Sequence, residues 1–193
     1  MAASALGSQS LMQESLAGQL LLASPALLDP NFRRSVVLIG VHSQEGALGV
    51  VLNRPSSVTV GEAVPALEAA VAGQEPVYVG GPVQPGSVVL LAEFLDPDPA
   101  GMLVVGRIGF PAADADLEQL ANATARRRVF AGFAGWGEGQ LDAEVDDGDW
   151  IAHSALPEDV FTDVPGELWS AVLARKGGSY ALMARMPLDP SMN

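Results

Sequence analysis

Residues 130–144 read Phe-Ala-Gly-Phe-Ala-Gly-Trp-Gly-Glu-Gly-Gln-Leu-Asp-Ala-Glu, and their pattern changes at Gly135-Trp136-Gly137. The first part is apolar and predicts a strand, whereas the second is acidic and amphipathic and predicts a helix over 138–145. Because glycine has no Cβ, the glycines at the junction let the chain turn sharply or approach another surface closely. This geometry predicts that Trp136 forms the wall of a cleft.

The composition predicts one compact domain. The chain has 193 residues, of which 49% are hydrophobic and 17% are charged, as in ordinary globular domains. The longest apolar runs reach about six residues, far short of the roughly 20 of a membrane-spanning helix. The absence of cysteine excludes disulfides and thiolate chemistry. We expect a flexible N-terminal tail over 1–14, a single domain over 15–193 and a cytoplasmic location without membrane attachment.

The charge is strongly negative and unevenly distributed. The formal net charge is −13, and residues 138–163 contain nine acidic side chains and neither lysine nor arginine. Such a surface repels phosphate backbones, so direct nucleic-acid binding is disfavoured. Two interpretations stay open, a solvated acidic face and a site for a cation or a basic partner.

Hydrophobic patterning predicts strands and helices mixed without a regular βαβ period, which is typical of α+β proteins. The expected helices begin at the capping-box sequence Thr59–Glu62 and at 114, 138 and 167. Gly177 is the expected C-cap of the last helix. The expected strands cover 18–23, 36–41, 47–52, 77–79, 88–94, 102–108, 129–134 and 150–153.

Standard catalytic signatures are missing from the sequence. The two histidines, His42 and His153, both stand at expected strand ends, where a structural role is the simpler interpretation. We therefore predict no catalytic residues, no metal ligands and no cofactor.

Three loops carry the candidate ligand-binding residues. One ends a strand with an amide and a guanidinium that could grip a carboxylate or phosphate. The second offers backbone N–H groups beside two glycines, and the third sets an indole beside a helix N-terminus. Each also has a structural explanation: an internal ion pair, a tight turn or a core tryptophan. The candidate residues are Asn53, Arg54, Gly80, Gly81, Trp136, Gln140 and Glu144.

Several ordered motifs together resemble the YqgE/AlgH family of bacterial proteins. They include Gly18–Pro25, Asp29–Val36, Glu45–Pro55, Gly80–Val83 and Gly132–Leu141. The resemblance implies an α+β single domain with a bent, mainly antiparallel sheet that forms a partial barrel with helices packed around it. The family is largely uncharacterised, and its name comes from a proposed regulatory role in alginate production. One departure is Glu138, where the family pattern has proline, which would stiffen the helix entry.

Three functions follow as hypotheses. The first is a non-enzymatic binding or regulatory module, in which a groove lined by glycine and tryptophan takes an unknown small molecule or protein partner. The second is a metal-assisted hydrolase or nuclease-like enzyme that uses Glu144 and Asp142, with Asp29 as a further candidate. The third, a transcriptional regulator, rests on the family name and on the three arginines 126–128, which otherwise form ion pairs where the strand begins.

Overall fold

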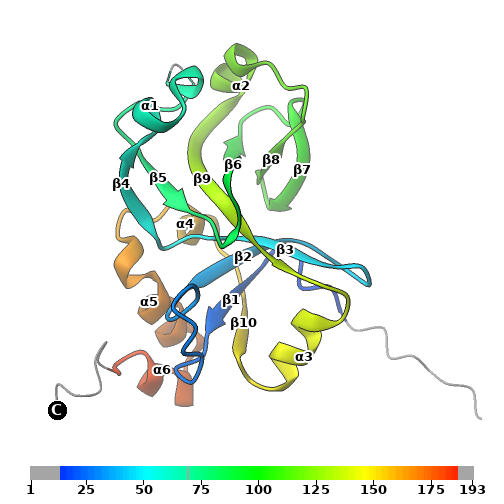
Figure 1. The fold of residues 1–193 in the computed structure, drawn as a ribbon, viewed down its shortest axis with the longest axis vertical. Coiled ribbons are helices and arrows are strands. Elements are labelled where there is room, and N and C mark those ends of the chain that lie inside the picture. The colour runs from blue at the N-terminus through cyan, green and yellow to red at the C-terminus, as the bar shows by residue number, and fades with distance from the viewer. Residues whose placement is uncertain (1–13, 69, 187–193) are drawn as a thin grey trace, which may run out of the picture.

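The computed structural model describes residues 14–68 and 70–186. A ten-stranded sheet curls into a half-barrel, and the helices pack around it (Figure 1). The predicted fold class, an α+β single domain with a bent antiparallel sheet, is therefore confirmed. The predicted flexible tail lies outside the described residues except for Glu14, which is exposed.

The sheet has two halves, which lie one above the other in Figure 1. Its main path runs β10-β1-β2-β3-β9-β6-β8-β7, and β4 and β5 attach to it through pairing of β5 with β9. The strands are β1 (Gln19–Ala23), β2 (Val36–Ser43), β3 (Gly46–Val51), β4 (Pro55–Thr59), β5 (Pro76–Val79), β6 (Val83–Phe94), β7 (Ala100–Val105), β8 (Ile108–Pro111), β9 (Thr124–Trp136) and β10 (Trp150–Ser154).

Strand β9 joins the two halves. Its last residues, 134–136, pair antiparallel with β3 in the lower half. Residues before them pair antiparallel with β6, and Phe130 pairs in parallel register with Tyr78 of β5. The glycine-spaced sequence suits this position, because a strand with close neighbours on both edges must let other backbones approach.

The helices cover the rims and one face of the half-barrel. The helix expected to begin at 167 is α5 (Leu168–Lys176), and its side chains predicted to point inward (Leu168, Trp169, Val172 and Leu173) are all buried. The indole of Trp169 also donates to the Ala23 carbonyl over 2.9 Å, which ties this helix to β1. The helices are α1 (Val60–Ala63), α2 (Leu117–Ala123), α3 (Gln140–Asp146), α4 (Pro157–Val160), α5 (Leu168–Lys176) and α6 (Ser179–Met183), with 3-10 turns at Pro65–Leu67 and Pro165–Glu167.

Several predicted element boundaries were wrong; β6, for example, begins at Val83 rather than at 88. The capping box at Thr59 forms, but α1 ends at Ala63 because Pro65 cannot continue the hydrogen-bond ladder. The strand expected over 102–108 is a hairpin of β7 and β8, which reverses at Gly106 with φ +57°. The strand expected over 129–134 begins earlier, at Thr124, so the three arginines lie within β9.

None of the helices in the described residues has the length and hydrophobicity required to cross a membrane.

Candidate functional site

Glu144 is the centre of a hydrogen-bonded cluster at the junction of β9 and α3. Its Oε2 accepts from the indole N–H of Trp136 over 2.8 Å and from that of Trp150 over 2.9 Å. Its Oε1 accepts from the Gln140 amide over 2.8 Å, and Gln140 accepts in turn from the N–H of Gly137 over 3.0 Å. Gly139, with φ +65°, begins the helix that carries Gln140 and Glu144. One carboxylate thus connects helix and sheet.

The two indoles pack into the lower core. Trp136 is 7% exposed and Trp150 is 3% exposed. Their ring centroids lie 5.7 Å apart at 78°, and Phe32 stacks on Trp136 at 6.2 Å. Edge-to-face and stacked aromatic contacts of this kind stabilise a core. The structural explanation for Trp136 therefore accounts for its contacts, and its ligand-binding role stays a prediction.

Asn53 binds two backbone groups across the loop that precedes β2. Its side-chain oxygen accepts from the N–H of Val36 over 2.9 Å, and its amide donates to the Arg34 carbonyl over 2.9 Å. Val36 is fully buried. Asn53 thus satisfies a main-chain donor that water does not reach.

We expect Asn53→Ala to lower the free energy of unfolding by about 2 kcal/mol, because the Val36 N–H loses its acceptor. Asn53→Asp keeps an acceptor at that position and should cost less. Urea denaturation of the three proteins measures the difference. Equal losses in the alanine and aspartate variants would mean that the Val36 bond does not matter.

Arg54 and Gly81 share a hollow of about 330 Å³, with Val79 and Pro82 among its other walls. The Arg54 guanidinium donates to the carbonyls of Pro30 and Arg33, both over 3.1 Å. Burial lowers the Arg54 pKa, and the nearby charge of Asp29 opposes that effect. The structural explanation for Arg54 was an ion pair, and the structure gives it main-chain carbonyls instead.

Gly80 is engaged in the sheet. Its N–H donates to the Ala131 carbonyl over 2.9 Å, and its carbonyl accepts from Val51 over 2.9 Å. The sequence had suggested that the N–H of Gly80 could bind an anion, but in the structure this group is used within the sheet.

Five of the seven predicted residues thus fall into two separate groups, and Asn53 and Gly80 belong to neither. Trp136, Gln140 and Glu144 form the cluster at the junction of β9 and α3, and none of them lines the hollow beside Arg54 and Gly81. The structure therefore does not bring all of these residues into one groove.

The structure places all three carboxylates proposed for metal catalysis, and Asp29 accepts from the N–H of Asn31 over 2.8 Å. Glu144 holds the indoles, and Asp142 faces His42, whose Nε2 lies 3.3 Å from its Oδ1. The Nδ1 atom of His42 accepts from the N–H of Leu16 over 2.9 Å, which is the structural role expected of this histidine. Across residues 14–68 and 70–186, no three histidine, aspartate or glutamate side chains gather in a way that could hold a metal ion.

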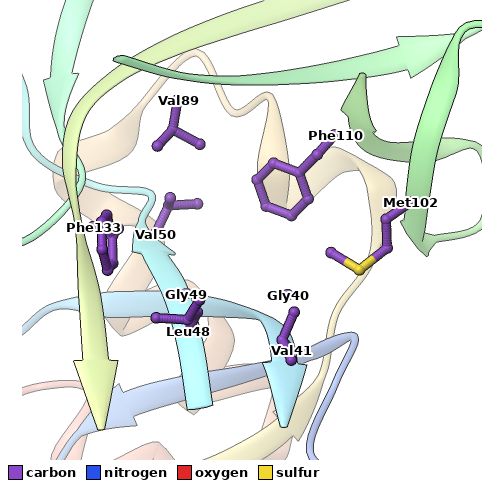
Figure 2. Close-up of a pocket in the computed structure, with 9 residues that line it drawn as sticks. All are labelled: Gly40, Val41, Leu48, Gly49, Val50, Val89, Met102, Phe110 and Phe133. Atoms are coloured by element: carbon purple, nitrogen blue, oxygen red, sulfur yellow. The ribbon is translucent and has the colours of Figure 1, made fainter. Parts of the chain in front are cut away.

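The sequence did not reveal an apolar cavity between the two halves of the sheet (Figure 2). Its volume is about 220 Å³. Strands β2, β3, β6, β7, β8 and β9 all contribute to it, and no lining residue has a polar side chain. The lining residues are Gly40, Val41, Leu48, Gly49, Val50, Val89, Met102, Phe110 and Phe133.

Two glycines and two exposed apolar residues mark this cavity. A Cβ added to Gly40 would lie 2.8 Å from the Phe110 ring, so glycine lets β8 approach β2. Val41 and Leu48 remain 39% and 46% exposed although both belong to paired strands. The sequence signal that could have predicted this cavity is a glycine next to an exposed apolar residue in each of two paired strands, Gly40 and Val41 in β2 and Gly49 and Leu48 in β3.

The three arginines of β9 have different contacts. Arg126 forms the expected ion pair, with Glu93 over 2.7 Å. Arg127 donates to the Ala121 carbonyl, and Arg128 donates to the carbonyls of Val160 and Thr162. The ion-pair interpretation therefore holds for Arg126 alone.

Comparison with known proteins agrees with this fold. The AlgH-like family model DUF179 matches residues 20–181. A UPF0301 protein of Streptomyces coelicolor is 43% identical over 185 residues, which cover 93% of this chain and 96% of that protein. A UPF0301 protein of Mycobacterium tuberculosis is 42% identical over 182 residues, which cover 92% of this chain and 90% of the relative.

Two solved structures are similar. The crystal structure of a protein from Corynebacterium diphtheriae has a TM-score of 0.81 at 31% identity, and the alignment covers 90% of this chain and 94% of that protein's chain. The solution structure of AlgH from Pseudomonas aeruginosa has a TM-score of 0.66 at 28% identity, with coverage of 98% and 100%. The match of the family model over most of the chain, with these relatives, shows that the protein belongs to the AlgH-like family.

Proposed function

We propose that this protein is a non-enzymatic binding module whose apolar cavity takes an apolar group of a small ligand. The observation that carries the proposal is a cavity without polar side chains whose lining includes Val41 and Leu48, both of which are partly exposed. Apolar surface left in contact with water at a concave position marks binding sites in soluble domains.

The size of the cavity suggests the ligand class. An apolar cavity of about 150 Å³ accommodates benzene in another protein. The volume here, about 220 Å³, suits one aromatic ring or a short branched aliphatic group. The rest of such a ligand would lie outside, over Val41 and Leu48.

The position of the cavity supports a regulatory use of binding. Gly40 and Leu48 belong to the lower half of the sheet, whereas Met102 and Phe110 belong to the β7–β8 hairpin of the upper half. A ligand that contacts both halves favours the arrangement in which both sets of contacts form. A binding module can report a ligand in this way without any reaction.

The hollow beside Arg54 and Gly81 is a second place within the proposal where the predicted ligand-binding residues could act. A cytoplasmic location is also part of the proposal, because a chain without cysteine has no disulfide to gain in an oxidising compartment.

Binding of the uncharged fluorophore N-phenyl-1-naphthylamine tests the cavity. We expect saturable fluorescence enhancement with the wild-type protein. Leu48→Glu should weaken the affinity about tenfold, because a carboxylate at the rim must lose hydration when the ring enters. Leu48 is 46% exposed, so this variant should remain folded.

Leu95→Glu is the matched control, since Leu95 is 57% exposed and does not line the cavity. Its charge change is the same, and its affinity should equal that of the wild type. If both variants bind the fluorophore equally, the probe sits elsewhere and the assignment of the cavity is wrong.

A further inference from the structure

A second pocket, of about 250 Å³, lies beside the arginine-bearing part of β9. Its walls come from β5, from β9 and from the segment that follows α4. Unlike the apolar cavity, it carries charged side chains of both signs, among them Arg126, Arg128, Glu75 and Asp163. Its chemistry therefore calls for a different ligand.

Arg128 presents a fixed positive charge in this pocket. Its Nη1 donates to the Val160 carbonyl over 2.6 Å and its Nη2 to the Thr162 carbonyl over 3.0 Å. The guanidinium carbon lies 4.3 Å from the centre of the Tyr78 ring. Within the described residues no carboxylate forms an ion pair with Arg128. Its charge is held in place but not neutralised by contact, which is unusual for a half-buried cation.

Arg126 adds a second guanidinium on the same side of the strand, because residues two apart on a strand share a face. Its carbon lies 4.7 Å from the centre of the Phe161 ring, and that of Arg128 lies 5.8 Å from the same ring. Only the Nε of Arg126 has a hydrogen-bond partner among the described residues, Glu93. Two terminal N–H₂ groups thus remain to bind a ligand.

Burial has the largest effect on the pKa of Arg128. Burial lowers the pKa of its guanidinium, and the charge of Arg126 acts in the same direction, whereas Tyr78, Glu75 and Asp163 oppose both. An arginine stays protonated under such conditions. An anion between the two guanidinium groups would relieve their mutual repulsion.

Two carboxylates complete the recognition chemistry. Glu75 and Asp163 line the pocket, both residues are exposed, and neither side chain accepts a hydrogen bond from another residue in the described part of the chain. Carboxylates in this position would accept from N–H or O–H groups of a ligand. A simple anion would satisfy the arginines only.

We infer that this pocket binds a small oxyanion ligand, a carboxylate or a phosphate, that also carries hydrogen-bond donors. The oxyanion lies between Arg126 and Arg128, and its donors face Glu75 and Asp163. A site of this kind is independent of the apolar cavity, because the two share no lining residue.

Nuclear magnetic resonance titrations at constant ionic strength test this site, with inorganic phosphate in one arm and acetate in the other. We expect saturable shifts of the backbone amides of 125–129 and 161–163. Saturation by phosphate assigns a phosphoryl group to the site, and saturation by acetate assigns a carboxylate. Shifts in both arms that only follow salt concentration would overturn the inference.

Arg126→Gln should weaken the binding of the saturating anion about tenfold, since it removes charge-assisted hydrogen bonds. Arg185→Gln is the matched control, because Arg185 is exposed and does not line the pocket. It should bind the anion with the wild-type affinity. Equal affinities in both variants would contradict the proposed contact.

Asp163→Asn should change the anion affinity in the opposite direction to Arg126→Gln. It removes a negative charge that faces Arg128, so the anion should bind two- to threefold more tightly. Asp163 is exposed, and the substitution should leave the fold intact. An unchanged or weaker affinity would show that the anion does not lie near these arginines.

Discussion

Gly81→Ala should be among the most damaging single substitutions in this chain. A Cβ at this position would lie 2.2 Å from the carbonyl carbon and 2.3 Å from the carbonyl oxygen of Phe133. Both atoms belong to the backbone of β9, which cannot move without breaking its pairing with β6. We expect the free energy of unfolding to fall by about 3 kcal/mol or more, and the melting temperature by about 10 °C.

Gly86→Ala is the control for this substitution, because no atom lies within 4 Å of the added Cβ. Its melting temperature should stay close to that of the wild type or rise slightly, since alanine reduces the freedom of the unfolded chain. Thermal unfolding of both variants, followed by circular dichroism, gives the comparison. Near-equal melting temperatures would mean that β9 accommodates the methyl group.

Glu144→Ala should have the second large effect. The substitution leaves the indole N–H groups of Trp136 and Trp150 without their acceptor in a buried position. Each unsatisfied buried donor costs about 1–3 kcal/mol, so the two together should cost about 2–6 kcal/mol. Urea denaturation measures it, and the two indole N–H resonances should shift strongly.

Two variants separate the hydrogen bonds from the charge. Glu144→Gln keeps an acceptor oxygen and should recover a good part of the lost stability. Glu138→Ala removes a neighbouring exposed carboxylate and should change stability by less than about 0.5 kcal/mol. If Glu144→Ala is no worse than Glu138→Ala, the cluster does not stabilise the fold.

The sequence predicted the fold well where local chemistry decides it. The inward face of α5 and the capping box at Thr59 follow from spacing within one turn of helix, and both form. The turn at 102–108 was missed because an apolar run with one internal glycine suits either one strand or a hairpin. Strand β4 was missed because its sequence, Pro-Ser-Ser-Val-Thr, has little apolar alternation.

The candidate site was harder to predict, because it depends on which distant segments meet. Trp136 and Glu144 are eight residues apart, and their association follows from a strand that passes directly into a helix. The contact of Trp150 with the same carboxylate needs the return of the chain through β10. Likewise, the apolar cavity unites Gly40 with Phe110, 70 positions later, and no local pattern encodes that meeting.

Strand β9, which both halves of the sheet share, determines how the protein unfolds. Its 13 residues form the ladder partners of β3 below and of β5 and β6 above. Loss of either half therefore removes backbone partners from the other, so neither is an autonomous folding unit. Because both halves pair with the same strand, we expect unfolding to be cooperative, with one transition for the whole sheet rather than two.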